Sequence, residues 1–122
     1  VIACGNEHGD ILSDGAAAAL GRMGMMCSSA ITPDTGAALF ESGAVTAPTL
    51  AGKDQANPLG RTLTAAMMLR HLGAVNGAKA IEGAVRQVLK EGYGTLDLCA
   101  AGGPQMNCVS TSKMGELILS RL

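Results

Sequence analysis

The segment from residue 81 to residue 92 constrains the fold of this chain most strongly. Apolar side chains recur there at the three- and four-residue spacing of an α-helix, and Gly92 ends the pattern. The apolar positions are Ile81, Ala84, Val85, Val88 and Leu89. A helix with one apolar stripe packs that stripe against another element, so the segment predicts a helix that covers a core.

A second helix is predicted after Asn57-Pro58, because asparagine is a common N-cap and proline is tolerated in the first helical turn. Its apolar stripe comprises Leu59, Leu63, Ala66, Met67 and Leu72, and Gly73 ends it. Two more helices are expected, one over residues 10–20 and one that begins near Ser112.

Short strands are expected between and beside these helices, and the middle two are joined by a turn that contains proline and glycine. The predicted strands cover residues 1–4, 28–31, 37–40 and 95–98, and loops are expected at residues 42–57 and 100–109. The pattern predicts an α/β fold with about four helices and several short strands. At this length we expect a single domain over residues 1–122.

The composition argues against two classes of partner. A formal net charge of −1 and scattered basic residues give no electrostatic support for binding to nucleic acid or to an anionic membrane surface. The chain has one Phe, one Tyr and no Trp, so it also lacks aromatic side chains on which bases would stack. No apolar run is long enough to span a bilayer.

The four cysteines, at positions 4, 27, 99 and 108, form no Cys-x-x-Cys pair and have no spacing typical of a zinc site. In a helix-rich chain with no signal-peptide pattern, this arrangement predicts reduced thiols and a cytoplasmic location.

Asp10 and Asp14 lie four residues apart near the start of a predicted helix, so their carboxylates share one helix face. Hard oxygen ligands arranged in this way suit Mg²⁺ or Mn²⁺. Alternatively, Asp10 complements the positive end of the helix dipole. The spacing alone does not decide between these two interpretations.

The sequence of residues 1–14, Val-Ile-Ala-Cys-Gly-Asn-Glu-His-Gly-Asp-Ile-Leu-Ser-Asp, resembles the segment that enters the metal-binding helix of the isocitrate/isopropylmalate dehydrogenase family. The resemblance continues in order through residues 37–41, 47–48, 51–53, 56–58, 65–73 and 80–82, and it weakens after residue 98. It covers most of the chain and corresponds to the C-terminal portion of the family. Members of this family are metal- and NAD(P)-dependent β-decarboxylating dehydrogenases.

The resemblance implies a partial isopropylmalate-dehydrogenase-like fold in which Asp10 and Asp14 bind the metal ion that carries the hydroxy-acid substrate. In the family, a further aspartate comes from the partner subunit, and the substrate arginines and the catalytic lysine and tyrosine come from upstream segments. These groups have no counterpart among the 122 residues. We therefore expect weak binding of Mg²⁺ or Mn²⁺ and no complete dehydrogenase chemistry from this chain alone. It resembles a fragment or a truncated relative, with a missing N-terminal half as a potential partner.

The cofactor loop of the family reads Phe-Glu-Pro-Val-His-Gly-Ser-Ala-Pro-Asp, whereas residues 40–49 read Phe-Glu-Ser-Gly-Ala-Val-Thr-Ala-Pro-Thr. By this resemblance, Ala44 replaces the histidine on the adenine side, Val45 replaces a glycine, and Thr49 replaces the aspartate that bonds the ribose in NAD-dependent members. Asn57 is retained as a cofactor-binding candidate, although helix capping also explains it. We expect NAD and NADP to bind poorly.

Two functions from other classes stay open. One is a non-catalytic module that folds by self-association through residues 1–4, 16–20 and 23–26. The other is a small hydrolase that uses Ser13, His8 and Asp10, although no G-x-S-x-G motif supports it. We expect a homo-oligomer, most simply a dimer, because sheet edges that upstream segments cover in the family have no cover within this chain.

Overall fold

The computed structural model describes residues 2–20, 22–44, 46–100 and 106–122. Within this part of the chain the elements, in order, are α1 (Asn6–Leu20), η1 (Met23–Met25), β1 (Cys27–Ile31), β2 (Ala38–Ser42), η2 (Pro48–Leu50), α2 (Leu59–His71), α3 (Val75–Lys90), β3 (Tyr93–Gly94), α4 (Leu96–Ala100), β4 (Asn107–Cys108) and α5 (Thr111–Leu119). The predicted α/β class is confirmed, with one more α-helix than the sequence pattern indicated. None of the described helices is long and apolar enough to span a membrane.

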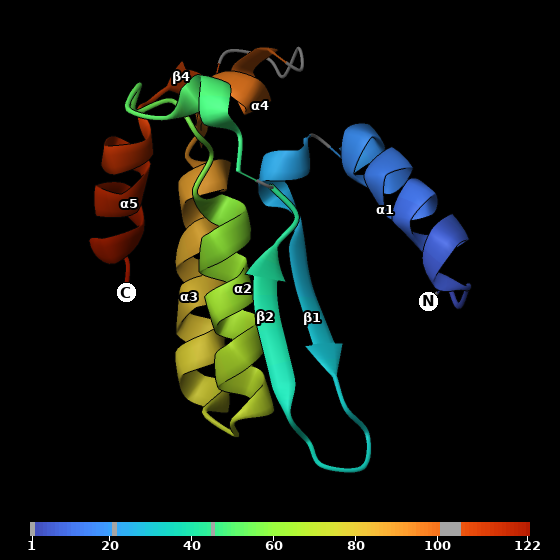
Figure 1. Ribbon diagram of the computed structural model, residues 1–122. Helices are drawn as coiled ribbons and strands as arrows, with labels where there is room; N and C mark the ends of the chain where they lie inside the picture. Colours follow the sequence, from blue (N-terminus) through green and yellow to red (C-terminus); the bar gives the residue numbers. More distant parts are fainter. Residues whose placement is uncertain (1, 21, 45, 101–105) are drawn as a thin grey trace.

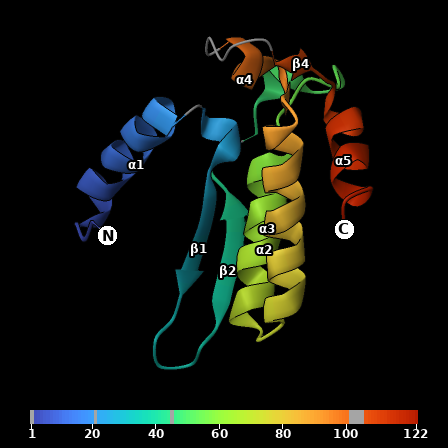
Figure 2. The ribbon, with the colours of Figure 1, turned by 180° about the vertical axis from the view of Figure 1, so that it is seen from behind.

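Helices α2 and α3 form the centre of the molecule and lie side by side in both views of the ribbon (Figures 1 and 2). The chain reverses between them at Gly73, whose φ of +81° is a conformation that glycine adopts without strain. The core forms where α5 packs against α3 and the start of α2. It consists of Leu59, Ala84, Val85, Val88, Met114 and Ile118.

The core confirms most of the predicted apolar stripes. Val85 and Val88 of α3 are buried, as are Leu59 and Ala66 of α2. Leu72 is an exception, because it lies beyond the last residue of α2 and its side chain is exposed to solvent.

Strands β1 and β2 form the predicted antiparallel hairpin, with Ser29 opposite Phe40. The hairpin lies against α2. The Thr64 hydroxyl of that helix donates to the backbone oxygens of Gly60, at 2.8 Å, and Glu41, at 3.2 Å. These contacts attach one end of β2 to α2, and at the turn end of the hairpin His71 Nε2 of α2 lies 3.0 Å from the Gly36 backbone oxygen. The hairpin therefore runs along α2 (Figure 1).

Helix α1 stands apart from the central helix pair and contacts the rest of the molecule chiefly through η1 (Figures 1 and 2). Of its described side chains, only Ala17 is buried. Ile11 and Leu12 are 69% and 51% exposed. Helix α1 therefore exposes both apolar and acidic side chains, and few other described residues pack against it.

Two predicted strands are wrong. Residues 2–4 belong to no regular element, and residue 1 lies outside the described part of the chain. Residues 96–98 belong to α4, because the Thr95 backbone oxygen accepts from the amides of Leu98 and Cys99 and so begins a helical turn. The nearby strand is β3, which pairs in parallel with β4. β4 lies within the predicted loop 100–109, of which residues 101–105 are not described.

The expectation of four reduced cysteines is also wrong. Cys99 and Cys108 form a disulfide, whereas Cys4 and Cys27 are free and exposed. The parallel pairing of β3 with β4 explains this, because it brings residue 108 back to the segment that leads into α4. A cytoplasmic location stays a prediction, and it loses the support that unpaired thiols gave it.

Candidate functional site

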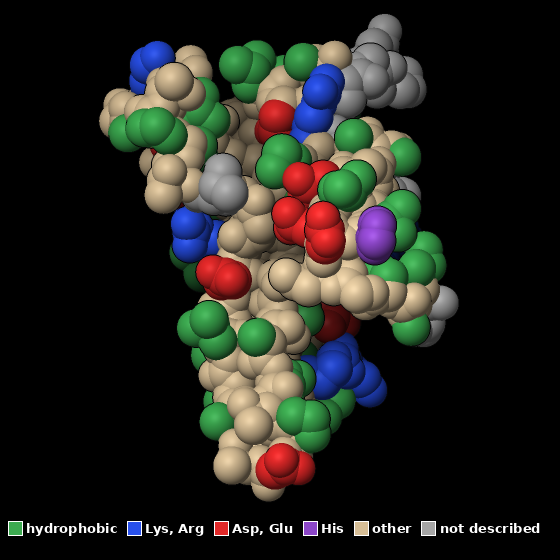
Figure 3. Space-filling model, turned by 45° about the vertical axis from the view of Figure 1, so that its right-hand side comes forward, with side chains coloured by type: hydrophobic (Ala, Val, Ile, Leu, Met, Phe, Trp, Pro, Cys, Tyr) green, Lys and Arg blue, Asp and Glu red, His purple; other side chains and the backbone are tan. Residues whose placement is uncertain are grey.

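Asp10 and Asp14 lie one turn apart on the exposed surface of α1, as predicted. The Ser13 hydroxyl donates to the Asp10 backbone oxygen at 3.0 Å, but neither aspartate side chain has a hydrogen bond or ion pair within the described residues. Figure 3 brings the α1 side of the molecule forward and shows acidic side chains gathered there. The two carboxylates are therefore free to bind a cation.

The donor set fits a divalent cation in part. Carboxylate oxygens are the ligands that Mg²⁺ and Mn²⁺ prefer, but a pair of aspartates leaves most of an octahedral shell to water or to other groups. No group of three or more His, Cys, Asp or Glu side chains suitable for a metal ion occurs within the described ranges. The described residues thus supply two neighbouring carboxylates here and no third side-chain donor.

The same helix gives no support to the hydrolase hypothesis. Ser13 and His8 are five residues apart on α1, which places them about 140° apart around the helix axis. The Ser13 hydroxyl is hydrogen-bonded to the backbone of its own helix. A serine activated by a neighbouring histidine needs a direct hydrogen bond between them, and the helix geometry opposes it.

Asn57 lies just before α2 and contacts a second polar residue. The predicted N-cap position is one residue early, because Pro58 is the N-cap and Leu59 begins the helix. The Asn57 Oδ1 nevertheless accepts from the Leu59 amide, the first of the helix, at 2.9 Å. Its Nδ2 donates to Asp97 Oδ2 at 3.0 Å. The other Asp97 carboxylate oxygen accepts from the Thr95 hydroxyl. Three polar side chains from two separate segments therefore form one network.

This network lies at a pocket of about 480 Å³. Asn57 and Asp97 form part of its polar lining, and Met23, Leu50 and Ala44 contribute apolar surface. The volume and the mixture of apolar walls with few polar groups are typical of small-molecule sites. Of the two loop positions singled out from the sequence, Ala44 lines this pocket, whereas the exposed Thr49 is not part of the lining.

Gly24 allows η1 to approach this polar network closely. A Cβ atom at this position would lie 2.6 Å from the Cβ of Asn57 and 3.0 Å from Asp97 Oδ2. Glycine is the residue that permits such an approach without displacing the neighbouring side chains. The width of the pocket therefore depends on the absence of a side chain at position 24.

Sequence reasoning missed Arg22 and Asp97 as site residues. The Arg22 Nε donates to the Asp97 backbone oxygen at 3.2 Å across 75 positions of sequence, and both residues line the pocket. The one available signal was the family resemblance, which extends to Asp97 before it weakens. Arg22 carried no local signal, because only the fold brings it to the pocket.

Asp54 joins the loop that precedes α2 to the start of α5. Its carboxylate accepts from the Ser112 amide and hydroxyl, both at 2.8 Å, and the Asp54 backbone oxygen accepts from the Thr111 amide. Hydrogen bonds from Ser110 and Ser112 hold the pKa of Asp54 below its ordinary value. This contact fixes the segment that leads from η2 to Asn57, and so it helps to position one wall of the pocket.

Comparison with known proteins gives one consistent result. A model of the isocitrate/isopropylmalate dehydrogenase family matches residues 1–118. The chain is 45% identical over 119 residues to 3-isopropylmalate dehydrogenase of Pectobacterium atrosepticum, a match that covers 97% of this chain and 31% of that protein. It is 46% identical over 123 residues to 3-isopropylmalate dehydrogenase of Oleidesulfovibrio alaskensis, covering 100% of this chain and 33% of that protein.

A solved structure agrees with the sequence comparison. The crystal structure of isocitrate dehydrogenase from Methylococcus capsulatus superposes with a TM-score of 0.83 and 40% sequence identity, covering 93% of this chain and 32% of that chain. The chain therefore spans about a third of the length of the relatives that it matches.

Proposed function

Because this chain belongs to the isocitrate/isopropylmalate dehydrogenase family, we propose that it is the C-terminal portion of a metal- and NAD(P)-dependent β-decarboxylating 2-hydroxy-acid dehydrogenase. The observation that carries this proposal is the pair of free carboxylates at Asp10 and Asp14, one turn apart on an exposed helix in a family member. Catalysis as an oxidoreductase then requires a further segment or subunit, since the chain spans only a third of its relatives.

Asp10 and Asp14 would hold Mg²⁺ or Mn²⁺ on one face of α1. When bound, such a cation supplies Lewis-acid stabilisation of negative charge on the oxygen of a hydroxy-acid substrate. In this proposal the chain supplies two carboxylate ligands at a fixed spacing on α1. The remaining coordination positions of the metal ion would be taken by the substrate and by ligands from another segment.

The pocket at Asn57 is the proposed cofactor site. Asn57 supplies a polar edge, but Ala44 offers no hydrogen-bonding side chain, and Thr49 offers no charge to a ribose. Loss of a charged hydrogen bond costs on the order of 1.5–3 kcal/mol, which corresponds to roughly tenfold to more than a hundredfold in affinity. We therefore expect weak binding of NAD or NADP by this chain.

Titration with Mn²⁺ tests the metal proposal. The wild-type chain should bind the ion weakly and Asp10→Ala and Asp14→Ala should each bind it more weakly still, because removal of either carboxylate leaves a single protein ligand. Asp34→Ala is the matched control, since Asp34 is an exposed aspartate in the hairpin turn and should leave binding unchanged. Identical titration curves for the wild type and the two site variants would contradict the proposal.

The second candidate function is a non-catalytic module that self-associates, and the exposed apolar side chains of α1 favour it. Ile11 and Leu12 present a solvent-facing apolar surface next to the acidic pair. The candidate surface is narrower than the sequence suggested, because Met25 packs against the core of its own chain. We place this surface on α1, and the oligomeric state of the purified chain tests it.

A further inference from the structure

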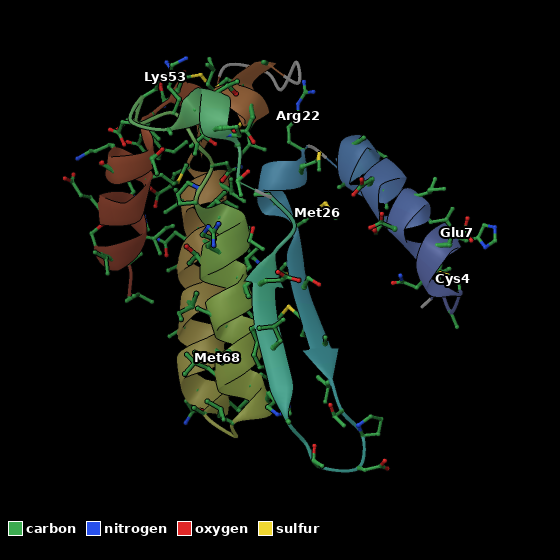
Figure 4. All side chains as sticks on the ribbon, viewed as in Figure 1. Cys4, Glu7, Arg22, Met26, Lys53 and Met68 are labelled. Carbon is green, nitrogen blue, oxygen red and sulfur yellow. A yellow bond between two sulfur atoms is a disulfide. The ribbon has the colours of Figure 1, made fainter. Side chains whose placement is uncertain are left out.

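Arg22 connects α1 to η1 and reaches across to the segment that carries Asp97. Figure 4 shows its side chain directed away from η1 and toward α4. Its Nε donates to the Asp97 backbone oxygen at 3.2 Å, and this single bond orients the guanidinium beside the pocket. Because Arg22 is exposed to solvent, its guanidinium lies at the rim of the pocket and not at its bottom.

The positive charge of Arg22 is not neutralised within the described part of the chain. The nearby carboxylate of Asp97 is engaged by Asn57 and by Thr95, and it accepts no hydrogen bond from the guanidinium. Neither terminal nitrogen of Arg22 has a hydrogen bond or an ion pair there. A planar group with free donors at a pocket rim suits an oxyanion, and above all a phosphate.

The remaining lining determines what such an anion is attached to. Among the residues that the structure describes, no lysine and no second arginine lines this pocket, and most of the lining is apolar, including Met23, Leu50 and Ala44. The lining also contains the Asp97 carboxylate, whose oxygens accept from Asn57 and Thr95. An apolar cavity with one cation at its rim fits a flat heterocycle that carries its anionic group on the Arg22 side. The ribose contact is also weakened in this chain, because Thr49 is outside the pocket lining and carries no charge.

On the basis of the proposed cofactor site, we propose that Arg22 binds a phosphate group of the nucleotide whose base enters the pocket. Arg22 is then the residue that makes the pocket select nucleotides over nucleosides. The phosphate is either the 2′-phosphate of an NADP-type cofactor or the 5′-phosphate that both dinucleotides share. Both phosphates would bind a guanidinium in the same way, so titration with 2′-AMP and with 5′-AMP is needed to distinguish them.

Calorimetric titration with adenosine, 2′-AMP and 5′-AMP tests the proposal. The wild-type chain should bind at least one of the two monophosphates roughly tenfold more tightly than adenosine, because a charged hydrogen bond is worth about that much. Arg22→Ala should remove this preference and leave adenosine affinity unchanged. Arg22→Lys should retain part of it, since an ammonium lacks the bidentate fork. The monophosphate that Arg22 favours identifies the phosphate.

The matched control is Arg86→Ala, because Arg86 is an exposed arginine on α3 with no part in this pocket, and it should behave as the wild type does. Equal affinity of the wild type for adenosine and for both monophosphates would overturn the role of Arg22 while leaving the pocket proposal intact. An equal monophosphate preference in Arg22→Ala would do the same. Failure of the wild type to bind adenosine at millimolar concentration would overturn the cofactor site, and the role of Arg22 with it.

Discussion

At the scale of the residue, Gly24 controls the fit between η1 and the pocket. Gly24→Ala would place a methyl group 2.6 Å from the Cβ of Asn57, so one of the two segments must move. Such overpacking typically costs about 1–3 kcal/mol, and thermal unfolding should show a lower Tm. Gly15→Ala is the control, because a Cβ at position 15 of α1 meets nothing within 4 Å and alanine favours the helix. An unchanged Tm for Gly24→Ala would contradict the reported packing.

Asp54 predicts how stability depends on pH. Its pKa is lowered in the folded chain, so the unfolded state binds a proton more readily. The stability that it contributes is therefore present above the unfolded pKa, near 3.8, and is lost as pH falls through the lower folded value. Urea denaturation of the wild type at pH 6 and pH 3 should show this loss, and Asp54→Asn should remove that part of the pH dependence.

The comparison variant for this experiment is Asp34→Asn, which changes an exposed aspartate of the hairpin turn. Asparagine also tolerates the left-handed backbone of residue 54, whose φ is +54°, so Asp54→Asn changes the charge without adding backbone strain. If the wild type and Asp54→Asn respond identically to pH, the contacts of Asp54 with Ser112 do not contribute to stability in solution.

Sequence reasoning found the residues whose role is local and missed those whose role depends on the fold. The Asn57 side chain accepts from the Leu59 amide, and Asp10 and Asp14 share one helix face, so four or fewer positions separate the two groups in each case. Arg22 and Asp97 meet across 75 positions. No periodicity or cap signal encodes such a meeting, because it depends on the path of the whole chain.

At the scale of the element, the disulfide joins α4 to β4. It closes a loop between residues nine positions apart, and a loop of that length is expected to contribute about 2–3 kcal/mol in the chain-entropy description. Treatment with a dithiol reductant should therefore lower the Tm of the wild type. Cys99→Ser should show the same lower Tm with and without the reductant. Cys4→Ser, at a free and exposed cysteine, should retain the response of the wild type.

The same region shows why some elements were predictable and others were not. Helices α2 and α3 carry long apolar stripes with clear ends, and the hairpin contains an explicit turn, so these elements followed from the sequence. The segment at residues 95–98 is short, and its conformation depends on a helical turn that begins at the Thr95 backbone oxygen. A five-residue helix such as α4 has too few positions to display a period.

At the scale of the whole molecule, the chain exposes more surface than its mass requires. Its accessible surface is 7894 Å² for 12.2 kDa, whereas a compact monomer of this mass exposes about 6,100 Å². The difference exceeds the roughly 800 Å² that each partner buries in a standard protein interface. Helix α1 stands apart from the central helix pair in both views and exposes Ile11 and Leu12 (Figures 1 and 2).

Self-association is therefore expected, with α1 at the interface. Light scattering at micromolar concentration should give the mass of a dimer for the wild type, because a closed two-fold pair is the commonest arrangement. Ile11→Glu combined with Leu12→Glu should give a monomer by placing charge on the exposed apolar surface. Leu72→Glu is the control, since this exposed leucine lies at the far end of α2. A well-folded wild-type monomer would show that α1 needs no partner.

The bond between Asp54 and the start of α5 also has a consequence for the order in which the chain folds. It joins residues 58 positions apart, so the entropy of a long loop must be lost before this contact forms. Helices α2 and α3 are neighbours in sequence and are joined at Gly73, so they can pair while that loop is still open. Helix α5 is then expected to dock late on a preformed pair, and the loop that lines the pocket is fixed in the same step, because its contact with α5 forms only then.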